Sequence, residues 1–266
     1  MLIPAEIKEN KRYGNVVRCN KCGLIYRTPR LKQLSELCFT QGRADFPREI
    51  TPARLAIFED ILRRISNFRK LNRILDVGSG RGVFLKMCND EGWFVSGVEI
   101  DPSLVDFTKR EYDIQISNNT LDKSNFPNDY FDVITFINVL EHCHYPTSIF
   151  SEAYKILRPG GAVLIRIPNA TLHVNSKRVF SKLYWLTRRI KSLDYSVIYI
   201  YSYGRVTIDN FLSENGFSNI QISNDSLRSQ NIISKFLGSL MYTIEFLSKG
   251  RLLLAPSLFI IASKPA

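Results

Sequence analysis

The segment Arg73-Ile-Leu-Asp-Val-Gly-Ser-Gly-Arg-Gly82 decides the fold of this 266-residue chain. Its first five residues predict a buried strand, and the glycine-rich turn behind them leads into a helical stretch that ends near Asn89. Such a turn lets the backbone approach a ligand closely and points the N–H groups of the helix start toward it. The segment therefore predicts a strand–turn–helix unit that binds a ligand.

Strands and helices alternate on both sides of this unit. Asp101-Pro102 predicts a helix start, with Asp as N-cap and Pro in the first turn. Arg158-Pro-Gly-Gly161 predicts the end of another helix. Alternation from 72 to 167 favours right-handed βαβ units and a parallel sheet with helices on both faces. The remaining expected elements are strands at 93–99, 131–138 and 162–167 and a helix at about 147–157.

The pattern changes after Pro168. Residues 171–195 combine apolar positions at helical spacing with six intervening Lys and Arg residues, which predicts a basic amphipathic helical segment. Beyond it, the sequence predicts helices at about 206–214 and 226–247, and strands at 217–223 and 257–262.

The turn differs from the dinucleotide-binding fingerprint. That fingerprint has a third glycine at its sixth position, where this chain has Val83 and places the glycine one residue earlier. Glu99 follows Gly78 by 21 residues and ends the second predicted strand. A carboxylate there can accept hydrogen bonds from both hydroxyls of a ribose. The turn and the carboxylate together indicate an adenosine-containing ligand.

Four motifs resemble class I S-adenosylmethionine-dependent methyltransferases, and within them the ubiquinone-biosynthesis-like O-methyltransferases. The resemblance covers about 70–265 and implies a Rossmann-like α/β fold, with a mostly parallel seven-stranded sheet, an antiparallel last strand and helices on both faces. The motifs are Ile74-Leu-Asp-Val-Gly-Ser-Gly-Arg-Gly-Val-Phe-Leu85, Gly97-Val-Glu-Ile-Asp101, Phe126-Pro-Asn-Asp-Tyr-Phe-Asp-Val-Ile134 with Asn138-Val-Leu-Glu-His142, and Leu157-Arg-Pro-Gly-Gly161.

This resemblance also implies the residues that bind the cofactor, S-adenosylmethionine. Asp76 would orient its amino group, the glycine turn would lie against its methionine portion, and Glu99 would hold its ribose. Ile100 would pack on the adenine. The remaining members of the implied cofactor set are Gly78, Ser79, Gly80, Gly82, Leu121, Asp122, Asn138 and Val139. A purely structural interpretation, in which the glycines make turns and the carboxylates cap helices, stands beside this assignment.

The implied reaction is an in-line displacement in which an acceptor atom attacks the sulfonium methyl. The protein then supplies alignment, and a general base where the acceptor is a hydroxyl. His142 is the first candidate for that base, because the pKa of histidine suits the task. The alternative is that Glu141 and His142 are structural. Tyr199, Tyr201 and Tyr203 occupy the region where related enzymes place acceptor-side residues, and packing is the alternative role for them.

The first 50 residues form a predicted N-terminal extension, with the methyltransferase domain at 51–266. Cys19-Asn-Lys-Cys22-Gly resembles a zinc-ribbon knuckle. Tetrahedral zinc needs four ligands, and the chain offers only Cys38 as a third. We therefore expect a truncated knuckle without metal. Cys19 and Cys22 stay the candidate ligands if zinc binds.

Charge is unevenly distributed along the chain. The net charge of +11 divides into +8 over residues 1–70, −4 over 71–170 and +7 over 171–266. Basic ends favour an anionic partner such as a phosphate or a membrane surface, or else form an ordinary solvated surface. The segment 171–200, between two predicted strands, is the expected acceptor-side insertion. Its basic face either lies in solvent or engages a phosphorylated or lipid-linked acceptor, with peripheral membrane contact.

Composition and termini narrow the class of protein. A content of 45% hydrophobic residues excludes a disordered or fibrous chain. The apolar stretch 252–263 is shorter than the about 20 residues of a spanning helix. The first residues lack the pattern of a secretion signal, so we expect a cytoplasmic protein. The predicted function is O-methylation of a small-molecule or saccharide acceptor, and the alternatives are nucleic-acid methylation and a non-catalytic scaffold.

Overall fold

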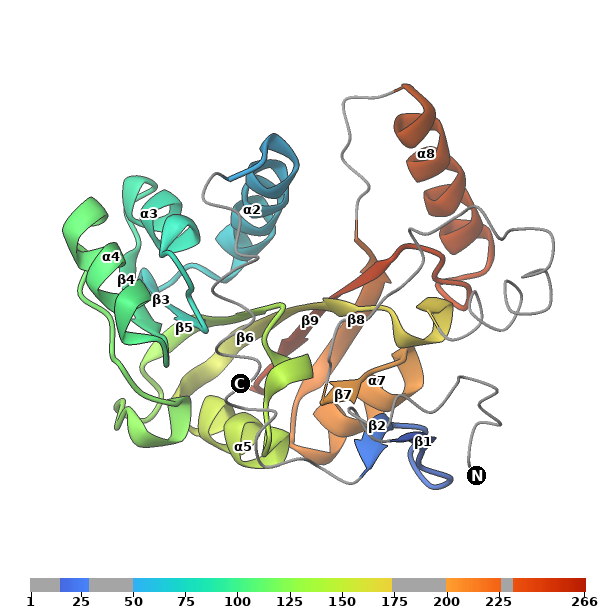
Figure 1. Ribbon diagram of the computed structural model, residues 1–266, viewed down its shortest axis with the longest axis horizontal. Helices are drawn as coiled ribbons and strands as arrows, with labels where there is room; N and C mark the ends of the chain where they lie inside the picture. Colours follow the sequence, from blue (N-terminus) through green and yellow to red (C-terminus); the bar gives the residue numbers. More distant parts are fainter. Residues whose placement is uncertain (1–14, 29–49, 174–199, 226–231) are drawn as a thin grey trace.

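The main sheet has six strands in the order β4–β3–β5–β6–β9–β8 in a computed structural model that describes residues 15–28, 50–173, 200–225 and 232–266 (Figure 1). The first four strands in this order run parallel, whereas β9 is antiparallel to both β6 and β8. The strands are β3 (Arg73–Val77), β4 (Phe94–Val98), β5 (Phe131–Ile137), β6 (Leu157–Pro168), β8 (Ser218–Asn224) and β9 (Ser257–Ser263).

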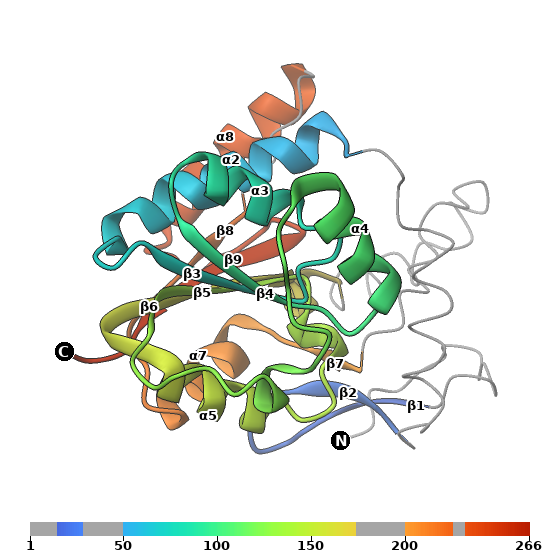
Figure 2. The same ribbon diagram turned by 90° about the vertical axis from the view of Figure 1, so that its left-hand side faces the viewer.

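Helices cover both faces of this sheet, as predicted. Figure 2 shows α2 (Pro52–Ile65), α3 (Val83–Asp90) and α4 (Pro102–Tyr112) on one face, and α5 (Pro146–Ile156) and α7 (Arg205–Glu214) on the other. The helix α8 (Ile232–Leu247) precedes β9. The described residues also contain the short 3-10 helices η1 (Ser66–Phe68), η2 (Leu121–Lys123) and η3 (Leu140–His142).

The hydrophobic core lies on both sides of the two central strands. β5 is buried at its first six positions, because helices cover both of its faces. One cluster packs β5 and β6 against α5 and α7, through Phe150 and Leu212 among others. A second packs the opposite face against α2 and α3, through Ile61 and Phe84. The sheet is therefore the middle of three layers.

The family resemblance implies a seven-stranded sheet, and the described residues contain six strands of it. Ser117 makes a single parallel bridge to Val98, at the edge where a further strand beside β4 would lie. The backbone N–H of Ser117 donates to the carbonyl of Gly97, and that of Glu99 to the carbonyl of Ser117 (2.9 and 3.0 Å). The segment thus pairs at one point only, which shortens the expected edge strand to a bridge.

Other predicted boundaries hold within a few residues. Asp101 caps α4 as expected, because its carboxylate accepts a hydrogen bond from the Ser103 backbone N–H (2.9 Å). The helix expected to end at Leu157 ends at Ile156, as α5. The strand expected to start at Ala162 starts five residues earlier, because β6 begins at Leu157. Phe131 pairs with Leu157, so the predicted helix stop at 158–161 lies inside the strand, at an irregularity of the ladder.

Asp132 fixes the start of β3 against β5. One of its oxygens accepts hydrogen bonds from the backbone N–H groups of Lys70, Leu71 and Arg73 (3.1, 2.6 and 3.2 Å), and the other pairs with Arg158. Burial would raise the pKa of this carboxyl, but the bonds from Arg158 and the backbone outweigh burial and lower it. The buried charge thereby holds the strand that leads into the glycine turn.

The N-terminal hairpin is joined to the rest of the fold. β1 (Asn15–Arg18) and β2 (Ile25–Thr28) pair antiparallel, and β2 also pairs with β7 (Tyr201–Ser202). The resulting three-stranded sheet lies beside α7 (Figure 1). The hydroxyl of Thr207 on α7 donates to the carbonyl of Cys22 (3.1 Å). In the structure the predicted extension is thus a strand partner of the segment that precedes α7.

Candidate functional site

The glycine turn curls over the carboxyl end of β4. Gly78, Gly80 and Gly82 have φ values of +69°, +57° and +67°, a region that favours glycine. The backbone N–H groups of Gly78 and Ser79 donate to the carbonyl of Val98 (2.8 and 3.2 Å). The loop after β3 is thereby tied to the end of the neighbouring strand, as the βαβ prediction requires.

Gly78 also lies against the end of β5. A Cβ atom at Gly78 would stand 2.5 Å from Cγ2 of Val139. No side chain fits there unless Val139 or the loop moves. The structure therefore brings together Gly78 and Val139, two members of the predicted cofactor set that are 61 positions apart in the sequence.

Glu99 binds the glycine turn through its carboxylate. One oxygen accepts from the backbone N–H of Gly80 (2.9 Å), and the other from those of Ile100 and Asp101 (2.8 and 3.0 Å). A carboxylate offers about four lone-pair sites, so three of these are used. The residue at the predicted ribose position therefore also holds the loop in shape and keeps acceptor capacity for a ligand hydroxyl.

Asp76 is a buried carboxyl beside Glu99. Its Oδ1 accepts a hydrogen bond from the Thr135 hydroxyl (2.6 Å). Burial raises the pKa of Asp76 to about 7; the Thr135 bond opposes the shift, the Glu99 charge adds to it, and Arg54 opposes it. Because a nearby cation favours the charged form, this environment suits a positively charged ligand group such as an ammonium.

Three further residues of the predicted cofactor set differ in exposure: Ile100 and Asp122 are exposed, whereas Leu121 is buried. Ile100 is 45% exposed, which leaves its side chain free to pack on a ring. Asp122 is exposed as well. Leu121 differs from the expectation, because its side chain is buried in the core cluster that contains Val77 and Val98. Its side chain is therefore unavailable to adenine.

The cofactor implied by the resemblance fits these residues. The buried hydroxyl oxygen of Ser79 has no hydrogen-bond partner among the described residues. A buried polar group without a partner costs about 1–3 kcal/mol, so a ligand atom at this position would be favourable. The turn thus offers a ligand closely approaching backbone, the hydroxyl of Ser79 and the carboxyls of Asp76 and Glu99. These groups match a ligand that carries hydroxyls and a positive charge.

Sequence analysis missed two arginines at this edge of the sheet. Arg166 on β6 donates through Nη1 to Oδ1 of Asn138 (2.7 Å) and through Nε to Asp225 (2.8 Å). Arg54 on α2 is partly buried, and its pKa is lowered by burial and by the charge of Arg166, with Asp76 opposing. A charge inside the otherwise apolar strand 162–167 was the available signal for Arg166. No motif marked Arg54.

Asn138 ends β5 in an unusual conformation. Its φ of +57° lies in the left-handed region, which asparagine tolerates better than most residues. The exposed side chain is held by Arg166. The strand end therefore turns sharply into η3, which carries the next two candidate residues.

Glu141 and His142 lie on η3 with opposite exposure. The predicted base His142 is exposed, and desolvation by the surrounding chain lowers its pKa. Glu141 is buried, its Oε2 has no partner among the described residues, and burial raises its pKa to about 8. Near neutral pH the histidine is therefore the proton acceptor of the two, and Glu141 is mostly protonated.

Tyr201 and Tyr203 are both buried. The Tyr201 hydroxyl donates to the carbonyl of His144 (3.3 Å). The Tyr203 hydroxyl has no partner among the residues that the structure describes, although the side chain is only 2% exposed. Burial raises the pKa of Tyr203 far above its ordinary value, and the neighbouring Cys143 adds to this. Packing thus explains Tyr201 and leaves the Tyr203 hydroxyl unused.

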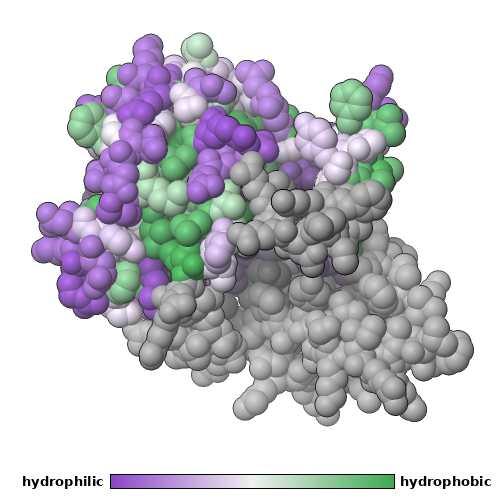
Figure 3. Space-filling model, turned by 90° about the horizontal axis from the view of Figure 1, so that it is seen from above, coloured by the Kyte–Doolittle hydropathy of each residue, from purple (hydrophilic) through white to green (hydrophobic). Residues whose placement is uncertain are grey.

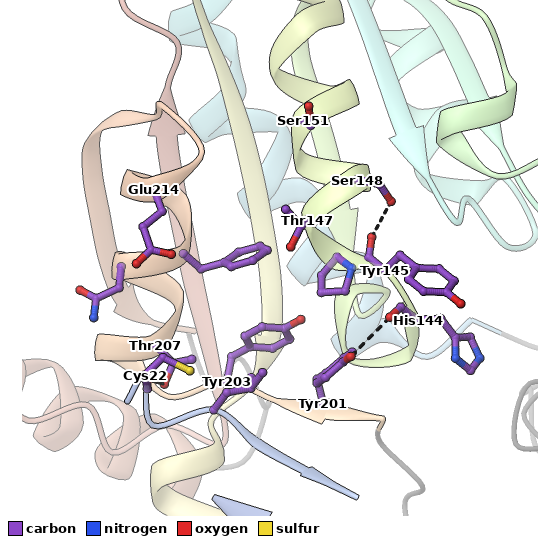
Figure 4. Close-up of a pocket in the computed structure, with 14 residues that line it drawn as sticks. Cys22, His144, Tyr145, Thr147, Ser148, Ser151, Tyr201, Tyr203, Thr207 and Glu214 are labelled. Atoms are coloured by element: carbon purple, nitrogen blue, oxygen red, sulfur yellow. Dashed lines mark hydrogen bonds between the residues drawn. The ribbon is translucent and has the colours of Figure 1, made fainter. Parts of the chain in front are cut away.

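A cavity of about 810 Å³ opens beside these tyrosines, between α5 and α7. Figure 4 shows Thr147 on α5, Glu214 on α7 and the hydroxyl of Tyr203 facing this space, with the ring of His144 turned away from α7. Cys22 and Leu24 of the N-terminal hairpin form part of its wall. The other lining residues are Tyr145, Pro146, Ser148, Ser151, Tyr201, Thr207, Asn210 and Phe211.

The cavity is connected to the glycine turn through η3. Val139, which contacts Gly78, directly precedes η3, and the carbonyl of Glu141 accepts from the backbone N–H of Ile200 (2.9 Å). Ile200 leads into β7, whose Tyr201 lines the cavity. The predicted cofactor site and the cavity therefore share one continuous segment of structure.

The predicted knuckle is a tight turn between β1 and β2. The Cys19 N–H donates to the carbonyl of Leu24 (2.8 Å), and Gly23 has a φ of +75°. The pKa of Cys19 is lowered by hydrogen bonds from the backbone of Cys22 and Lys21. Within the described residues no cluster of three or more metal-binding side chains occurs. Cys38, Tyr199 and most of the basic segment 171–195 lie outside those residues.

Comparison with known proteins places these features in a family. The profile of a family described as "Methyltransferase domain" matches residues 48–222. A ubiquinone biosynthesis O-methyltransferase of Coxiella burnetii is 28% identical over 125 residues, which are 45% of this chain and 51% of that protein. The matched region spans about half or less of the first curated relatives.

Solved structures show the same fold at low identity. A SAM-dependent methyltransferase from Archaeoglobus fulgidus superposes with a TM-score of 0.55 at 20% identity, over 79% of this chain and 94% of that one. Phosphoethanolamine N-methyltransferase 2 of Haemonchus contortus, in complex with S-adenosyl-L-methionine, gives a TM-score of 0.56 at 18% identity, over 88% and 58%. Among the described residues no helix is long and apolar enough to span a membrane.

We predict that Gly78→Ala disturbs the site more than an equally strained glycine elsewhere. Gly160 has the same φ of +69° but faces only the end of the Arg158 side chain. Gly160→Ala should cost about 1–2 kcal/mol from the backbone alone, and Gly78→Ala about 1–3 kcal/mol more from the clash with Val139. Thermal unfolding and titration with S-adenosylhomocysteine measure both effects. Equal loss of ligand affinity in the two variants would contradict the assignment.

We also predict that ligand affinity depends on pH through Asp76. The ammonium of S-adenosylhomocysteine prefers the ionised carboxylate, and the pKa of Asp76 is about 7 without ligand. Below pH 7 binding must expel a proton, so affinity should fall by up to about tenfold per pH unit. Calorimetric titration between about pH 5.5 and pH 8 tests this. Asp76→Asn should remove the dependence, and an unchanged profile in that variant would refute the role.

Proposed function

The chain belongs to the methyltransferase-domain family, with the class I fold and S-adenosylmethionine as its cofactor, and we propose that it methylates a hydroxyl of a small-molecule or saccharide acceptor. The observation that carries the acceptor proposal is the cavity between α5 and α7. Its wall includes Tyr203, whose buried hydroxyl has no hydrogen-bond partner among the described residues, and His144, which closely follows η3.

The cofactor supplies a methyl group activated on a positively charged sulfur. The proposed task of Asp76 is to hold the ammonium, and that of Glu99 is to hold the ribose while it fixes the turn through Gly80. Ser79 would donate or accept one further hydrogen bond. These residues lie at the carboxyl ends of adjacent parallel strands, where ligands bind in open α/β sheets.

The cavity lining supports a hydroxylated, uncharged acceptor. Hydroxyls of Tyr203, Thr147 and Ser151 can exchange hydrogen bonds with sugar or phenol hydroxyls. Among the described lining residues, Glu214 has the only carboxylate, and none is a lysine or arginine. A phosphorylated acceptor would therefore need cations from outside these residues, such as the basic segment 171–195.

Methylation of a hydroxyl also requires a proton acceptor. Transfer of the methyl group that the cofactor would supply to a hydroxyl oxygen would release the hydroxyl proton, and the sulfur would leave as a neutral thioether. We propose that His142 receives this proton, because its lowered pKa keeps the ring neutral near pH 7. Glu141 suits a positioning role, since its pKa of about 8 keeps it mostly protonated there.

The cofactor half of the proposal predicts selective binding of S-adenosylhomocysteine. Calorimetric titration should give micromolar affinity for this ligand and none for NAD. Glu99→Gln should lower the affinity at least about tenfold, because it removes a charge-assisted acceptor from the ribose and from Gly80. Asp106→Asn, an exposed change on α4, is the matched control. Wild-type protein that binds neither ligand would refute the cofactor half.

The acceptor half predicts that Tyr203→Phe impairs methyl transfer while cofactor binding stays intact. Transfer of labelled methyl is measured on a panel of phenols, polyols and saccharides. Loss of the unused hydroxyl should lower kcat/KM by about five- to a hundredfold on the best acceptor. Tyr201→Phe is the matched control, since its hydroxyl bonds to a backbone carbonyl, and it should change the rate less.

The same assay tests the base. His142→Gln should lower kcat and remove the acidic limb of its pH profile. Full activity of His142→Gln would exclude His142 as the base.

Full activity of Tyr203→Phe on every methylated acceptor would show that the acceptor binds outside the cavity between α5 and α7.

A further inference from the structure

The outward face of α8 is apolar. Leu240, Tyr242, Phe246 and Leu247 are between 46% and 76% exposed. With 3.6 residues per turn, these four side chains and the hydroxyls of Ser239 and Thr243 fall within an arc of roughly 160°. No charged residue of the stretch 239–247 lies in this arc. A solvated helix normally turns its polar side outward, so four large apolar side chains on the outward face of α8 are unusual.

The opposite side of α8, with Met241, Ile244 and Glu245 half-buried, faces the body of the molecule. Glu245 accepts hydrogen bonds through Oε2 from the backbone and the side-chain amide of Asn224 on β8 (3.1 and 2.8 Å). This contact fixes the rotation of the helix and so sets which side is exposed. Figure 1 shows α8 standing apart from the other helices, and Figure 3 shows several hydrophobic residues among polar ones at the upper right, where α8 lies.

Positive charge follows the apolar face directly. Lys249 and Arg251 are both exposed in the turn after α8, and Leu252 beside them is 55% exposed. The guanidinium of Arg205 lies against the same turn, since a Cβ at Gly250 would stand 3.4 Å from its Nη1. The apolar arc therefore ends in a cluster of cations.

We propose that this face of α8, with Lys249 and Arg251, docks the protein on an anionic membrane surface. A helix with exposed aromatic and aliphatic side chains next to cations lies in the interface of such membranes, with its apolar face among the acyl chains and its charges at the headgroups. This inference goes beyond the proposed methyl transfer and does not depend on it.

A second copy of the chain is the competing occupant. Two such helices in contact would bring together four exposed cations from Lys249 and Arg251. The only acid between Ser239 and Leu252 is Glu245, which is already bonded to Asn224. Anionic lipid supplies the missing negative charge, whereas the same face of a second copy does not. Charge complementarity thus favours the membrane.

Flotation of the full chain with lipid vesicles tests the proposal. Wild-type protein should float with vesicles that contain about one-third phosphatidylglycerol, bind neutral phosphatidylcholine vesicles weakly, and be released by salt. Phe246→Ser/Leu247→Ser should lower binding at least about tenfold. Lys249→Gln/Arg251→Gln should lower it about fivefold for each cation removed and weaken the salt dependence.

Phe94→Ser is the matched control, because Phe94 is 68% exposed on β4, outside α8. It should float as wild type, and all variants should keep the wild-type affinity for S-adenosylhomocysteine and the wild-type melting temperature. Absence of flotation by wild type, or equal flotation of Phe246→Ser/Leu247→Ser, overturns the proposal. So does a lipid-independent dimer, seen by light scattering, that the same double variant dissociates, because the face would then bind a second copy.

Discussion

The site depends on the close approach of Gly78 to Val139. These residues follow two adjacent parallel strands, β3 and β5. The space between the two residues is too small for a Cβ atom at Gly78. Parallel pairing alone brings the strand ends to one edge of the sheet. The missing side chain lets the two loops touch, so the glycine turn and η3 form one surface. Asp132 holds the opposite ends of the same strands together through the backbone of 70–73.

Two carboxyls on this surface differ in their hydrogen bonds. Glu99 accepts three backbone N–H groups and so fixes the glycine turn. Asp76 accepts one hydroxyl and faces the charge of Glu99, so burial dominates and the pKa of Asp76 rises to about 7. A ligand with a positive end completes the arrangement, because it lowers the cost of ionising Asp76.

Short sequence motifs predicted much of this site. Residues that tertiary packing brings to the site from distant parts of the chain were not predicted. The strand at 73–77, the turn, the cap at Asp101 and the position of Glu99 each follow from a short stretch of sequence. Arg54 and Arg166 were not predicted because their place in the site comes from tertiary packing of α2 and β6. Leu121 shows another limit of a motif, since a residue expected near the adenine turns its side chain into the core and leaves only its backbone for a ligand. The seventh strand is reduced to one bridge because Ser117 pairs at a single residue.

The N-terminal hairpin changes the interpretation of the Cys-x-x-Cys sequence. A turn closed by the Cys19–Leu24 backbone bond, with Gly23 in the left-handed region, presents the carbonyl of Cys22 to Thr207. β2 then extends β7, the strand that carries Tyr201 and leads to Tyr203. Cys22 and Leu24 thereby become wall residues of the cavity between α5 and α7. Because Cys22 and Leu24 complete a wall that is otherwise built from residues 144–151 and 201–214, the shape of the proposed acceptor pocket depends on the hairpin as well as on the methyltransferase domain.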